Sequence, residues 1–328
     1  MVSVYQNIIR SFPRGYSMAF AYGSGVMPQV GHAITRSSMI DFIFVVEDPL
    51  VWHRENMHLN PRHYSSLRLL GPATIETVQC NWGAKIYYNT LVPTHEGLIK
   101  YGVISERDLI CDLLDWETLY VAGRLHKPVN ILHKDSKDPE LERALQLNLS
   151  YAVRTALLLL PDTFSEEELY HTIAHLSYSG DFRMHVGEDK HKVRNIVEAQ
   201  LLEFRKLYAP VLDSLQDYVL LDATAPGTAI QDTSPHAKYR HLSLLPLQLQ
   251  LALVRDCNKD GRNRDVEEVL LVAAQDPDTQ DMVIKGVRSI VSRSSLTQAL
   301  KGVVTAGLWK SLKYSTAKVK KMISSWHR

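Results

Sequence analysis

The stretch MAFAYGSGVMPQVGHAITRSSMIDFIFVV, Met18 to Val46, contains the features that best indicate the fold of this chain. It opens with a short apolar strand, breaks at Gly23-Ser24-Gly25, and returns to an apolar strand that carries one carboxylate, Asp41. Glycines after a strand let the backbone turn sharply and bring bare N–H groups close to a phosphate. A carboxylate among Ile, Phe and Val is costly to bury unless it is paired or binds a metal ion. The stretch therefore predicts a strand–turn–strand device that holds a nucleoside triphosphate and a divalent cation.

Two better-known phosphate motifs are absent from the chain. There is no G-x-x-x-x-G-K-[ST], and G-S-G-V-M-P departs from the dinucleotide pattern G-x-G-x-x-G. The alternative to a nucleotide site at this point is a glycine-rich hairpin turn beside a strand with one polar residue.

The composition is that of a globular protein, and 328 residues leave room for two domains. Its three cysteines, Cys80, Cys111 and Cys257, form no C-x-x-C, which argues against a zinc site and favours a reducing compartment or an organelle matrix. The N-terminus is free of acidic residues and contains Arg10 and Arg14, which is faintly like a mitochondrial transit peptide. A plain N-terminal helix is the alternative.

The net charge of +1 hides an asymmetry, because no acidic residue follows Asp281. Apolar residues recur at helical spacing in this tail, from Leu300 to Trp326. A basic amphipathic helix with tryptophans lies well in a bilayer interface. The residues that we expect at an anionic membrane surface are Lys301, Trp309, Lys310, Lys313, Lys318, Lys320 and Lys321.

Two alternatives remain for this tail: a helix packed within the molecule, and a helix that binds nucleic acid. No RNP, KH or zinc-finger pattern supports the latter, so we expect no nucleic-acid partner. No apolar run reaches the roughly 18 residues that span a bilayer, so we expect any membrane contact to be peripheral.

Two further β-rich segments, Ala84–Asn89 and Leu98–Ile104, predict strands. Lys100 in the second segment would reach a triphosphate if its strand lay beside that of Asp41; an edge lysine extending toward water is the alternative. A capping box at Ser105 predicts a helix that continues to Gly123.

Several polar residues outside the strands are further candidates for a nucleotide pocket. Tyr64 and Ser65 offer hydroxyl groups, with a solvated helix face as the alternative. Arg124 follows the predicted helix, and Asp181 with Arg183 places an acid and a guanidinium in a loop that would close over a phosphate. A loop salt bridge is the alternative for this last pair.

Eight segments, in chain order, resemble the mitochondrial phosphatidate cytidylyltransferase family, also called the mitochondrial translocator assembly and maintenance protein. They are FAYGSGV, MIDFIF, NPRHYSSLRLLG, GAKIYYN, IKYGVIS, YVAGRLHKPV, LSYSGDFR and KGVVTAGLWKSLKY, and they run from about Phe20 to Tyr314. The resemblance implies that CTP and phosphatidic acid react, with Mg²⁺, to CDP-diacylglycerol and pyrophosphate. It also implies a peripheral enzyme on the matrix side of the mitochondrial inner membrane, early in cardiolipin biosynthesis.

The fold class that the resemblance implies is α+β. A polymerase-β-like nucleotidyltransferase domain (1–135) would precede a mainly helical, winged-helix-like domain (136–220). A connector with short helices (221–281), which the sequence predicts to be poorly packed, would lead to the basic amphipathic membrane-binding tail (282–328). The alternative function is a non-enzymatic scaffold for the mitochondrial protein-import machinery.

As a hypothesis for the mechanism, Asp41 would be the Mg²⁺ ligand and, with Lys100, a catalytic residue. The expected nucleotide contacts are Gly23, Ser24, Gly25, Tyr64, Ser65, Arg124, Asp181 and Arg183. One position departs from the wider superfamily, because Ile43 stands where a second acid is usual. The candidates for a second metal ligand are Asp112, Asp115 and Asp181.

Overall fold

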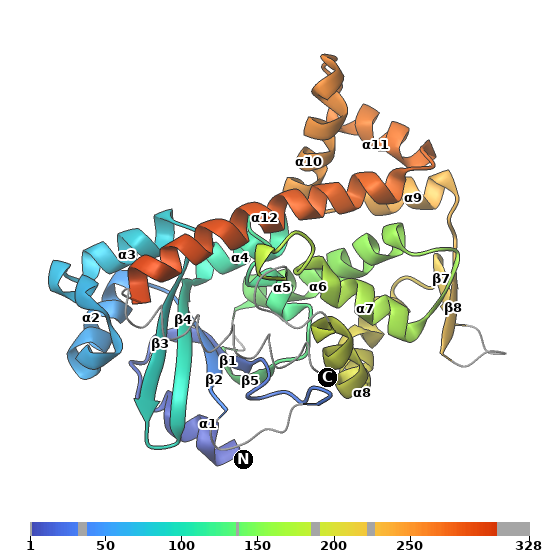
Figure 1. The fold of residues 1–328 in the computed structure, drawn as a ribbon. Coiled ribbons are helices and arrows are strands. Elements are labelled where there is room, and N and C mark those ends of the chain that lie inside the picture. Colours follow the sequence, from blue (N-terminus) through green and yellow to red (C-terminus); the bar gives the residue numbers. More distant parts are fainter. Residues whose placement is uncertain (1, 32–37, 136–137, 185–190, 222–226, 307–328) are drawn as a thin grey trace.

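The computed structural model describes residues 2–31, 38–135, 138–184, 191–221 and 227–306 (Figure 1). A five-stranded sheet takes up the first part of the chain, and helices with one small sheet take up the rest. The architecture is therefore α+β, as the sequence predicts.

The large sheet has the strand order β3-β4-β2-β1-β5. Its strands are β1 (Tyr16–Tyr22), β2 (Ile40–Val46), β3 (Ile86–Thr94), β4 (Gly97–Ser105) and β5 (Asn130–Lys134). β2 and β4 run parallel, and the other neighbouring pairs run antiparallel. The four strands predicted from the sequence are confirmed, and β3 continues to Thr94, beyond its predicted end at Asn89. The sequence does not predict β5, because its side chains are half-buried or exposed and form no apolar pattern.

Helices cover both faces of this sheet, which is why β2 is apolar on both sides. One face is covered by α1 (Val2–Ile9), α2 (Pro49–Leu59) and α3 (Pro72–Asn81), and the other by α4 (Glu106–Asp115). Phe42 faces the first group and Ile43 the second, since successive strand residues point to opposite faces. Asp41 therefore lies at the start of β2 on the face of Ile43.

Helix α4 begins as predicted, because the Ser105 hydroxyl accepts the backbone N–H of Asp108 at 3.0 Å. The prediction that the helix continues to Gly123 is wrong. It stops before Trp116, which adopts a left-handed conformation with φ of 53°. A separate turn of helix, α5 (Ala122–Leu125), follows. The apolar residues Leu109, Leu113, Trp116 and Tyr120, whose helical spacing favours a longer helix, are buried even though the helix ends.

The middle of the chain alternates helices with short strands. In order they are α6 (Pro139–Leu159), β6 (Thr163–Ser165), α7 (Glu166–Leu176), η3 (Phe182–Met184), α8 (Lys192–Asp213), β7 (Val219–Leu221) and β8 (Thr228–Gln231). The three strands form a second sheet in the order β6-β8-β7. Ser165 and Glu168 form a capping box at the start of α7.

The region predicted as a poorly packed connector is a packed helical segment where the structure describes it. It contains α9 (Pro235–Ser243), α10 (Leu247–Cys257) and α11 (Val266–Gln275), and it leads into α12 (Thr279–Ala306). Leu249, Leu253 and Val269 are fully buried in the core that also contains sheet residues. The prediction of loose packing is therefore wrong. It rests partly on the prolines of this region, but Pro235 is the first residue of helix α9, a position that proline favours.

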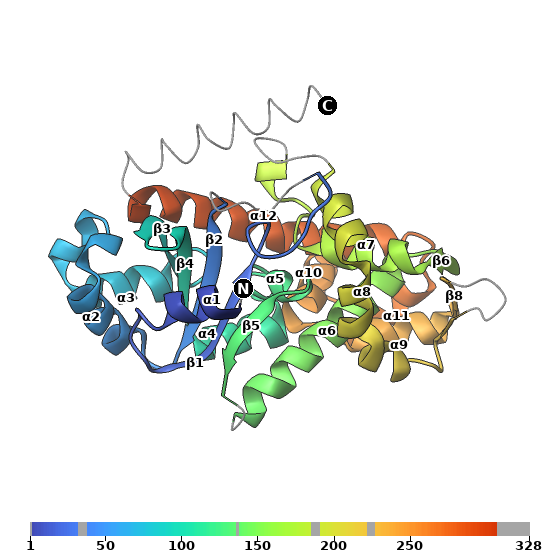
Figure 2. The same cartoon turned by 90° about the horizontal axis from the view of Figure 1, so that it is seen from below.

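Helix α12 runs beside the large sheet at one end and beside the helices of the second half of the chain at the other, as two views show (Figures 1 and 2). It packs on α10 and α6 and crosses the outer edge of β3. There the Gln298 side chain accepts the N–H of Ala84 at 2.9 Å and donates to the carbonyl of Ile86 at 3.2 Å. The tail helix predicted from residue 282 is therefore, as far as Ala306, packed within the molecule, which was the alternative to a membrane helix.

Candidate active site

The strand register brings the glycine turn against Asp41. Tyr22, the last residue of β1, is the pairing partner of Asp41 in β2, so Gly23 follows directly beside the carboxylate. Gly23 has φ of 80°, a conformation that favours glycine, and a Cβ there would lie 3.3 Å from Asp41 Oδ2. The backbone N–H groups of Val26 and Met27 both donate to the Gly23 carbonyl, at 3.0 and 2.9 Å. The turn is thus tightly wound, and its first glycine leaves room for the acid.

Gly25 is needed in the same turn for a different reason. A Cβ at Gly25 would lie 2.2 Å from the carbonyl oxygen of Met39, a distance that no side chain tolerates. The chain entering β2 therefore runs directly against the turn. Ser24 between the two glycines is half-buried.

Lys100 lies across from Asp41 in the parallel pairing of β2 and β4. Its Nζ is 3.8 Å from Asp41 Oδ1 and 4.4 Å from the centre of the Tyr88 ring. Asp41 Oδ1 is buried and has no hydrogen-bond partner among the described residues. A buried carboxylate oxygen without a hydrogen bond is costly, which is typical of a position prepared for a cation.

Three tyrosines and Arg124 extend the site beyond these strands. The guanidinium of Arg124 lies 3.9 Å from the Tyr120 ring centre and 5.5 Å from that of Tyr22. The hydroxyl groups of Tyr22 and Tyr88 are 3.4 Å apart. Burial by itself raises the pKa of Tyr120, but the surrounding guanidinium and ammonium groups outweigh burial and lower it to about 7. The site is therefore strongly cationic.

The loop pair predicted at Asp181 and Arg183 reaches the same tyrosine. Arg183 Nε lies 3.0 Å from each carboxylate oxygen of Asp181, and its Nη2 lies 2.6 Å from Oδ2. The Arg183 guanidinium is 5.9 Å from the Tyr120 ring centre. Because Asp181 is buried, the pair fixes Arg183 beside Arg124 rather than forming an exposed salt bridge.

The structure does not bring Tyr64 and Ser65 to this cluster. The Tyr64 hydroxyl bonds His53 Nδ1 at 2.8 Å and accepts from Asn56 at 2.9 Å. Asn56 also donates to Tyr101, which follows Lys100 and therefore points to the opposite face of the sheet. Ser65 caps the short helix η2 (Ser66–Leu70), which follows η1 (Pro61–His63).

Asp112 has a structural role that excludes it as an open metal ligand. Its carboxylate accepts the backbone N–H groups of Thr118, Leu119, Val121 and Ala122 and the Thr118 hydroxyl, at 2.8 to 3.0 Å. These bonds turn the chain after α4 and end the helix. No group of three or more His, Cys, Asp or Glu side chains suited to a metal ion occurs within the described residues.

The residues expected at a membrane surface are mostly outside the described part of the chain; these are Trp309, Lys310, Lys313, Lys318, Lys320 and Lys321. Lys301 is described, and it is not at the surface. It is 2% exposed and donates to the carbonyls of Gln79 and Trp82 at 2.9 and 2.8 Å. The expectation that Lys301 contacts lipid is therefore wrong.

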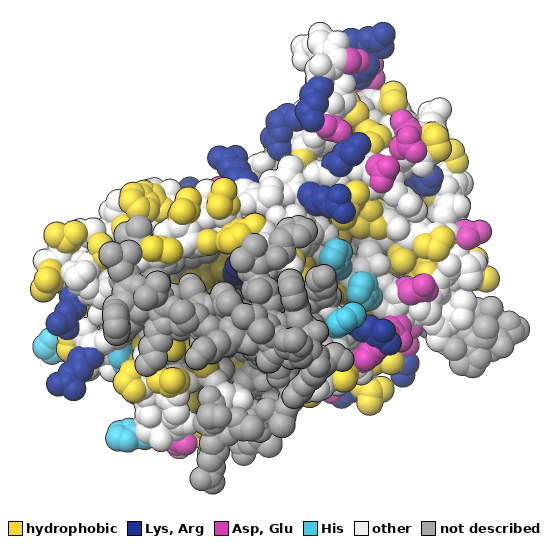
Figure 3. Space-filling model, in the orientation of Figure 1, with side chains coloured by type: hydrophobic (Ala, Val, Ile, Leu, Met, Phe, Trp, Pro, Cys, Tyr) yellow, Lys and Arg dark blue, Asp and Glu magenta, His cyan; other side chains and the backbone are white. Residues whose placement is uncertain are grey.

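The end of α12 nevertheless turns apolar side chains outward. Leu296 and Leu300 are 52% and 62% exposed, while Gln298 and Lys301 on the opposite side are buried. Figure 3 shows apolar side chains along this end of α12. No helix in the described stretches is both long and apolar enough to cross a bilayer.

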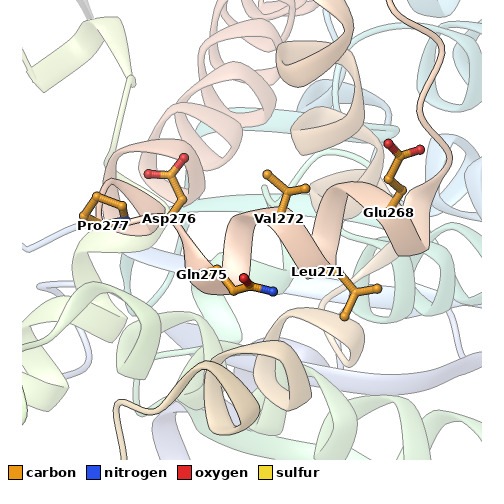
Figure 4. Close-up of a pocket in the computed structure, with 6 residues that line it drawn as sticks. All are labelled: Glu268, Leu271, Val272, Gln275, Asp276 and Pro277. Atoms are coloured by element: carbon orange, nitrogen blue, oxygen red, sulfur yellow. The ribbon is translucent and has the colours of Figure 1, made fainter.

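A shallow hollow on α11 lies on the projecting α10–α11 pair and contains none of the predicted site residues (Figure 4). η4 (Asn258–Asp260) joins these two helices. The hollow is lined by Glu268, Leu271, Val272, Gln275, Asp276 and Pro277. We assign it no role in the chemistry.

Comparison with known families identifies the chain. The family model described as "Phosphatidate cytidylyltransferase, mitochondrial" matches residues 5–321. The chain belongs to the mitochondrial phosphatidate cytidylyltransferase family. The resemblance inferred from the eight segments is thereby confirmed.

Individual members of the phosphatidate cytidylyltransferase family are similar over nearly the full chain. The Danio rerio protein of that name is 50% identical over 328 residues, which covers 99% of this chain and 96% of the relative. The Drosophila melanogaster protein is 44% identical and covers 98% of this chain and 99% of its own length. The Homo sapiens protein is 47% identical, covering 92% of this chain and 67% of the relative.

The tyrosine cluster is the part of the site that sequence reasoning missed. Tyr22, Tyr88 and Tyr120 come from two strands and from the turn around Asp112, so no spacing in the sequence links them. The one available signal was the position of Tyr22 directly before the glycine turn.

Proposed function

We propose that the cluster around Asp41 and Lys100 is the catalytic centre at which this nucleotidyltransferase converts CTP and phosphatidate to CDP-diacylglycerol and pyrophosphate, an early step of cardiolipin biosynthesis. The observation that carries the assignment is the closeness of Gly23 to Asp41: a glycine turn lies beside a carboxylate whose buried Oδ1 has no hydrogen-bond partner within the described part of the chain.

The triphosphate of CTP would lie along the turn formed by Gly23, Ser24 and Gly25. Backbone N–H groups in such a turn face an anion without intervening side chains. Lys100, Arg124 and Arg183 would balance its charge, since all three lie around Tyr120. Guanidinium groups suit this task because one guanidinium can donate two parallel hydrogen bonds to two oxygens of the same phosphate.

Asp41 fits the role of Mg²⁺ ligand because its buried Oδ1 has no hydrogen-bond partner among the residues that the structure describes. Mg²⁺ is commonly held by one or two carboxylates together with substrate phosphates and water, so a single acid is sufficient on the protein side. When bound, Mg²⁺ would neutralise charge on the triphosphate and on the departing pyrophosphate.

The acceptor needs little help with proton transfer. A phosphate monoester has its second pKa at about 6, so phosphatidate is mostly a dianion at neutral pH. One of its oxygens bonds to the α-phosphorus of CTP as the bond from that phosphorus to the pyrophosphate breaks. The protein's task is to align the two substrates and to offset their mutual repulsion.

The proposal also assigns a domain type to each part of the fold. The mixed sheet with its glycine turn would be a polymerase-β-like domain, and the segment from α6 to β8 would be a winged-helix-like domain. The sheet order β6-β8-β7 and the helices α6, α7 and α8 support this assignment. The Gln200 side chain on α8 donates to the Pro28 carbonyl at 2.8 Å, so α8 holds the segment after the glycine turn.

The basic composition of residues 307–328 supports a peripheral position on an anionic membrane. The stretch contains six lysine or arginine residues and no acid, and tryptophans at 309 and 326. Each basic residue near such a surface contributes about 1 kcal/mol of attraction. We place the enzyme on the matrix side of the mitochondrial inner membrane, where its lipid substrate would stay in the bilayer.

The test is CDP-diacylglycerol formation from labelled CTP on phosphatidate vesicles, with Mg²⁺ present or chelated. Asp41→Asn should lower turnover by roughly 100-fold or more while the protein stays folded. Asp213→Asn, at an exposed position on α8, is the matched control and should remain active. A folded wild-type protein that makes no product would overturn the proposal and favour the scaffold function.

A further inference from the structure

A second group of cations lies outside the Asp41 cluster. The Nζ of Lys127, after α5, lies 5.2 Å from the centre of the Tyr178 ring. The Nζ of Lys192, at the start of α8, lies 5.3 Å from the centre of the same ring. We call the group of Lys127, Ser177, Tyr178 and Lys192 the Tyr178 patch. Its members come from three separate segments, and the fold brings Lys127 to the other two from 50 or more residues earlier in the chain.

The packing around Lys127 fixes its ammonium group in place. A Cβ at Gly123 would lie 2.3 Å from Ser177 Cβ, so the glycine lets the two backbones approach. The ammonium of Lys127 donates to the Ser177 hydroxyl at 2.9 Å and to the Gly123 carbonyl. These neutral acceptors orient the charge without cancelling it.

The Tyr178 patch continues the cationic cluster through Arg124. Neither Lys127 nor Arg124 forms an ion pair with a carboxylate in the part of the chain that the structure describes. Burial, and then the charges of Arg124 and Lys192, hold the pKa of Lys127 well below its usual value. Like charges held together in this way are stabilised when an anion binds among them.

We propose that the Tyr178 patch binds the phosphate monoester of the lipid acceptor, while the Asp41 cluster binds the triphosphate. This inference rests on the cytidylyltransferase function proposed above. The reaction requires two phosphate-bearing substrates at the same time, and the structure contains two neighbouring groups of cations, with Arg124 in the first and Lys127 in the second. The guanidinium of Arg124 lies against the Tyr120 ring, and the backbone carbonyl of Arg124 accepts the N–H of Lys127 at 3.2 Å, so the two groups are joined within α5 and the residues directly after it.

The chemistry of the Tyr178 patch suits a compact dianion. Ammonium groups act as point charges with several donors and do not require the planar geometry that guanidinium groups match. The Ser177 hydroxyl adds a donor next to Lys127. All four side chains are half-buried, so a ligand can reach them while the partly desolvated position strengthens the attraction.

The experiment compares Lys127→Met and Lys192→Met with wild type, using CTP and the soluble dihexanoyl phosphatidate. The KM for phosphatidate should rise about tenfold or more in each variant, in line with a lost charge-assisted contact. The Kd for CTP, measured without lipid, should change less than about twofold. Lys206→Met is the matched control, because Lys206 is an exposed lysine of α8 paired with Glu203 at 2.9 Å, and it should change neither value.

An equal loss of CTP affinity in these variants would assign the patch to the triphosphate and overturn the inference, as would unchanged KM values. Thermal unfolding checks the fold, and Lys192→Met carries the test if Lys127→Met is unstable. Calorimetric titration with dihexanoyl phosphatidate and with inorganic phosphate separates the two phosphate sources. Inorganic phosphate that binds as tightly as the lipid would overturn the lipid assignment.

The same titrations separate this inference from the proposed function. If the wild type makes no product, the function fails, yet phosphatidate binding that is lost in Lys127→Met would still support the patch. If the wild type is active and phosphatidate binding is unchanged in both variants, the function stands and the patch is refuted.

Discussion

Lys100 is the parallel-strand partner of Asp41, and its ammonium lies 3.8 Å from Asp41 Oδ1. Charge-assisted hydrogen bonds between such groups are usually about 2.7–2.9 Å long, so this pair is open. The carboxylate oxygen remains buried without a hydrogen bond among the described residues. We interpret the open pair as a position kept for a cation and a phosphate rather than as a stabilising salt bridge.

Gly23→Ala should disturb this carboxylate. The new Cβ would lie 3.3 Å from Asp41 Oδ2, and φ of 80° is unfavourable for alanine by roughly 1–2 kcal/mol. We expect lower stability and a drop in CDP-diacylglycerol formation of about tenfold to hundredfold, because small displacements of a catalytic group are expensive. Steady-state rates together with urea unfolding measure both effects.

Gly261→Ala is the control for that substitution. Gly261 has a similar φ of 86°, and no atom lies within 4 Å of the added Cβ. The two variants should lose similar stability, and the Gly261 variant should keep normal turnover. Equal turnover in both variants would show that the Gly23 side of the turn does not position Asp41.

Tyr120 should ionise near neutral pH in the folded protein. The cations around it lower its pKa to about 7, from an ordinary value of 10.0. A near-ultraviolet titration should show phenolate absorbance appearing around this pH, and Tyr120→Phe should remove it. Tyr151→Phe is the control, since burial raises the pKa of Tyr151 instead. An unchanged titration curve in Tyr120→Phe would refute the assignment.

The same shift affects stability. An acid whose folded pKa is below its unfolded pKa stabilises the protein fully above the unfolded value and loses that contribution as the pH falls through the folded value. Wild type should therefore lose stability relative to Tyr120→Phe as the pH falls from about 10 to about 7. Denaturant unfolding at several pH values checks the sign.

Asp112→Asn should destabilise the fold without a specific effect on Mg²⁺ dependence. The carboxylate accepts bonds on both oxygens, and an amide can accept on only one of them. We expect the free energy of unfolding to fall by roughly 2–4 kcal/mol. Asp115→Asn, on the next turn of α4, should cost far less. A raised Mg²⁺ requirement in a stable Asp112 variant would contradict this structural role.

Substitution of Lys301 should affect stability, whereas removal of the segment after Ala306 should affect membrane binding. Lys301→Met leaves one buried and one partly buried carbonyl without their donor and should cost roughly 1–3 kcal/mol of stability, with vesicle binding unchanged. Removal of residues 307–328 should reduce vesicle binding and spare the affinity for CTP. Vesicle sedimentation and thermal unfolding distinguish the two effects, and full vesicle binding by the shortened chain would exclude the tail as the anchor.

Local chemistry made much of the fold predictable. The capping boxes at Ser105 and Ser165 act over three residues, and the apolar runs of β1 and β2 identify strands without knowledge of their partners. The sequence also predicts that the glycine turn and Asp41 lie together, because they belong to two successive strands that pair with each other. These features depend on neighbours in the sequence or on one strand pair.

The remaining features depend on contacts that the sequence does not display. α4 ends early because Asp112 binds the backbone of residues 118 to 122, which looks the same in the sequence as a solvated acid. Lys301 has the charge of a surface lysine, yet it bonds the end of α3 from more than 200 residues away. The Tyr178 patch requires the helical part of the chain to lie against α5. Spacing rules carry no information on such pairings.

The hydrogen bonds that join Gln298 to Ile86 at the start of β3, and to Ala84 just before that strand, cover the edge of the large sheet, and they can form only late in folding. Gln298 and Ala84 are separated by 214 residues, so the outer edge of β3 stays uncovered until nearly the whole described chain is present. Contacts of such large separation form late, and uncovered strand edges invite pairing between molecules. A chain that stops before α12 would therefore be prone to self-association during folding, which makes the last described helix a requirement for solubility as well as for shape.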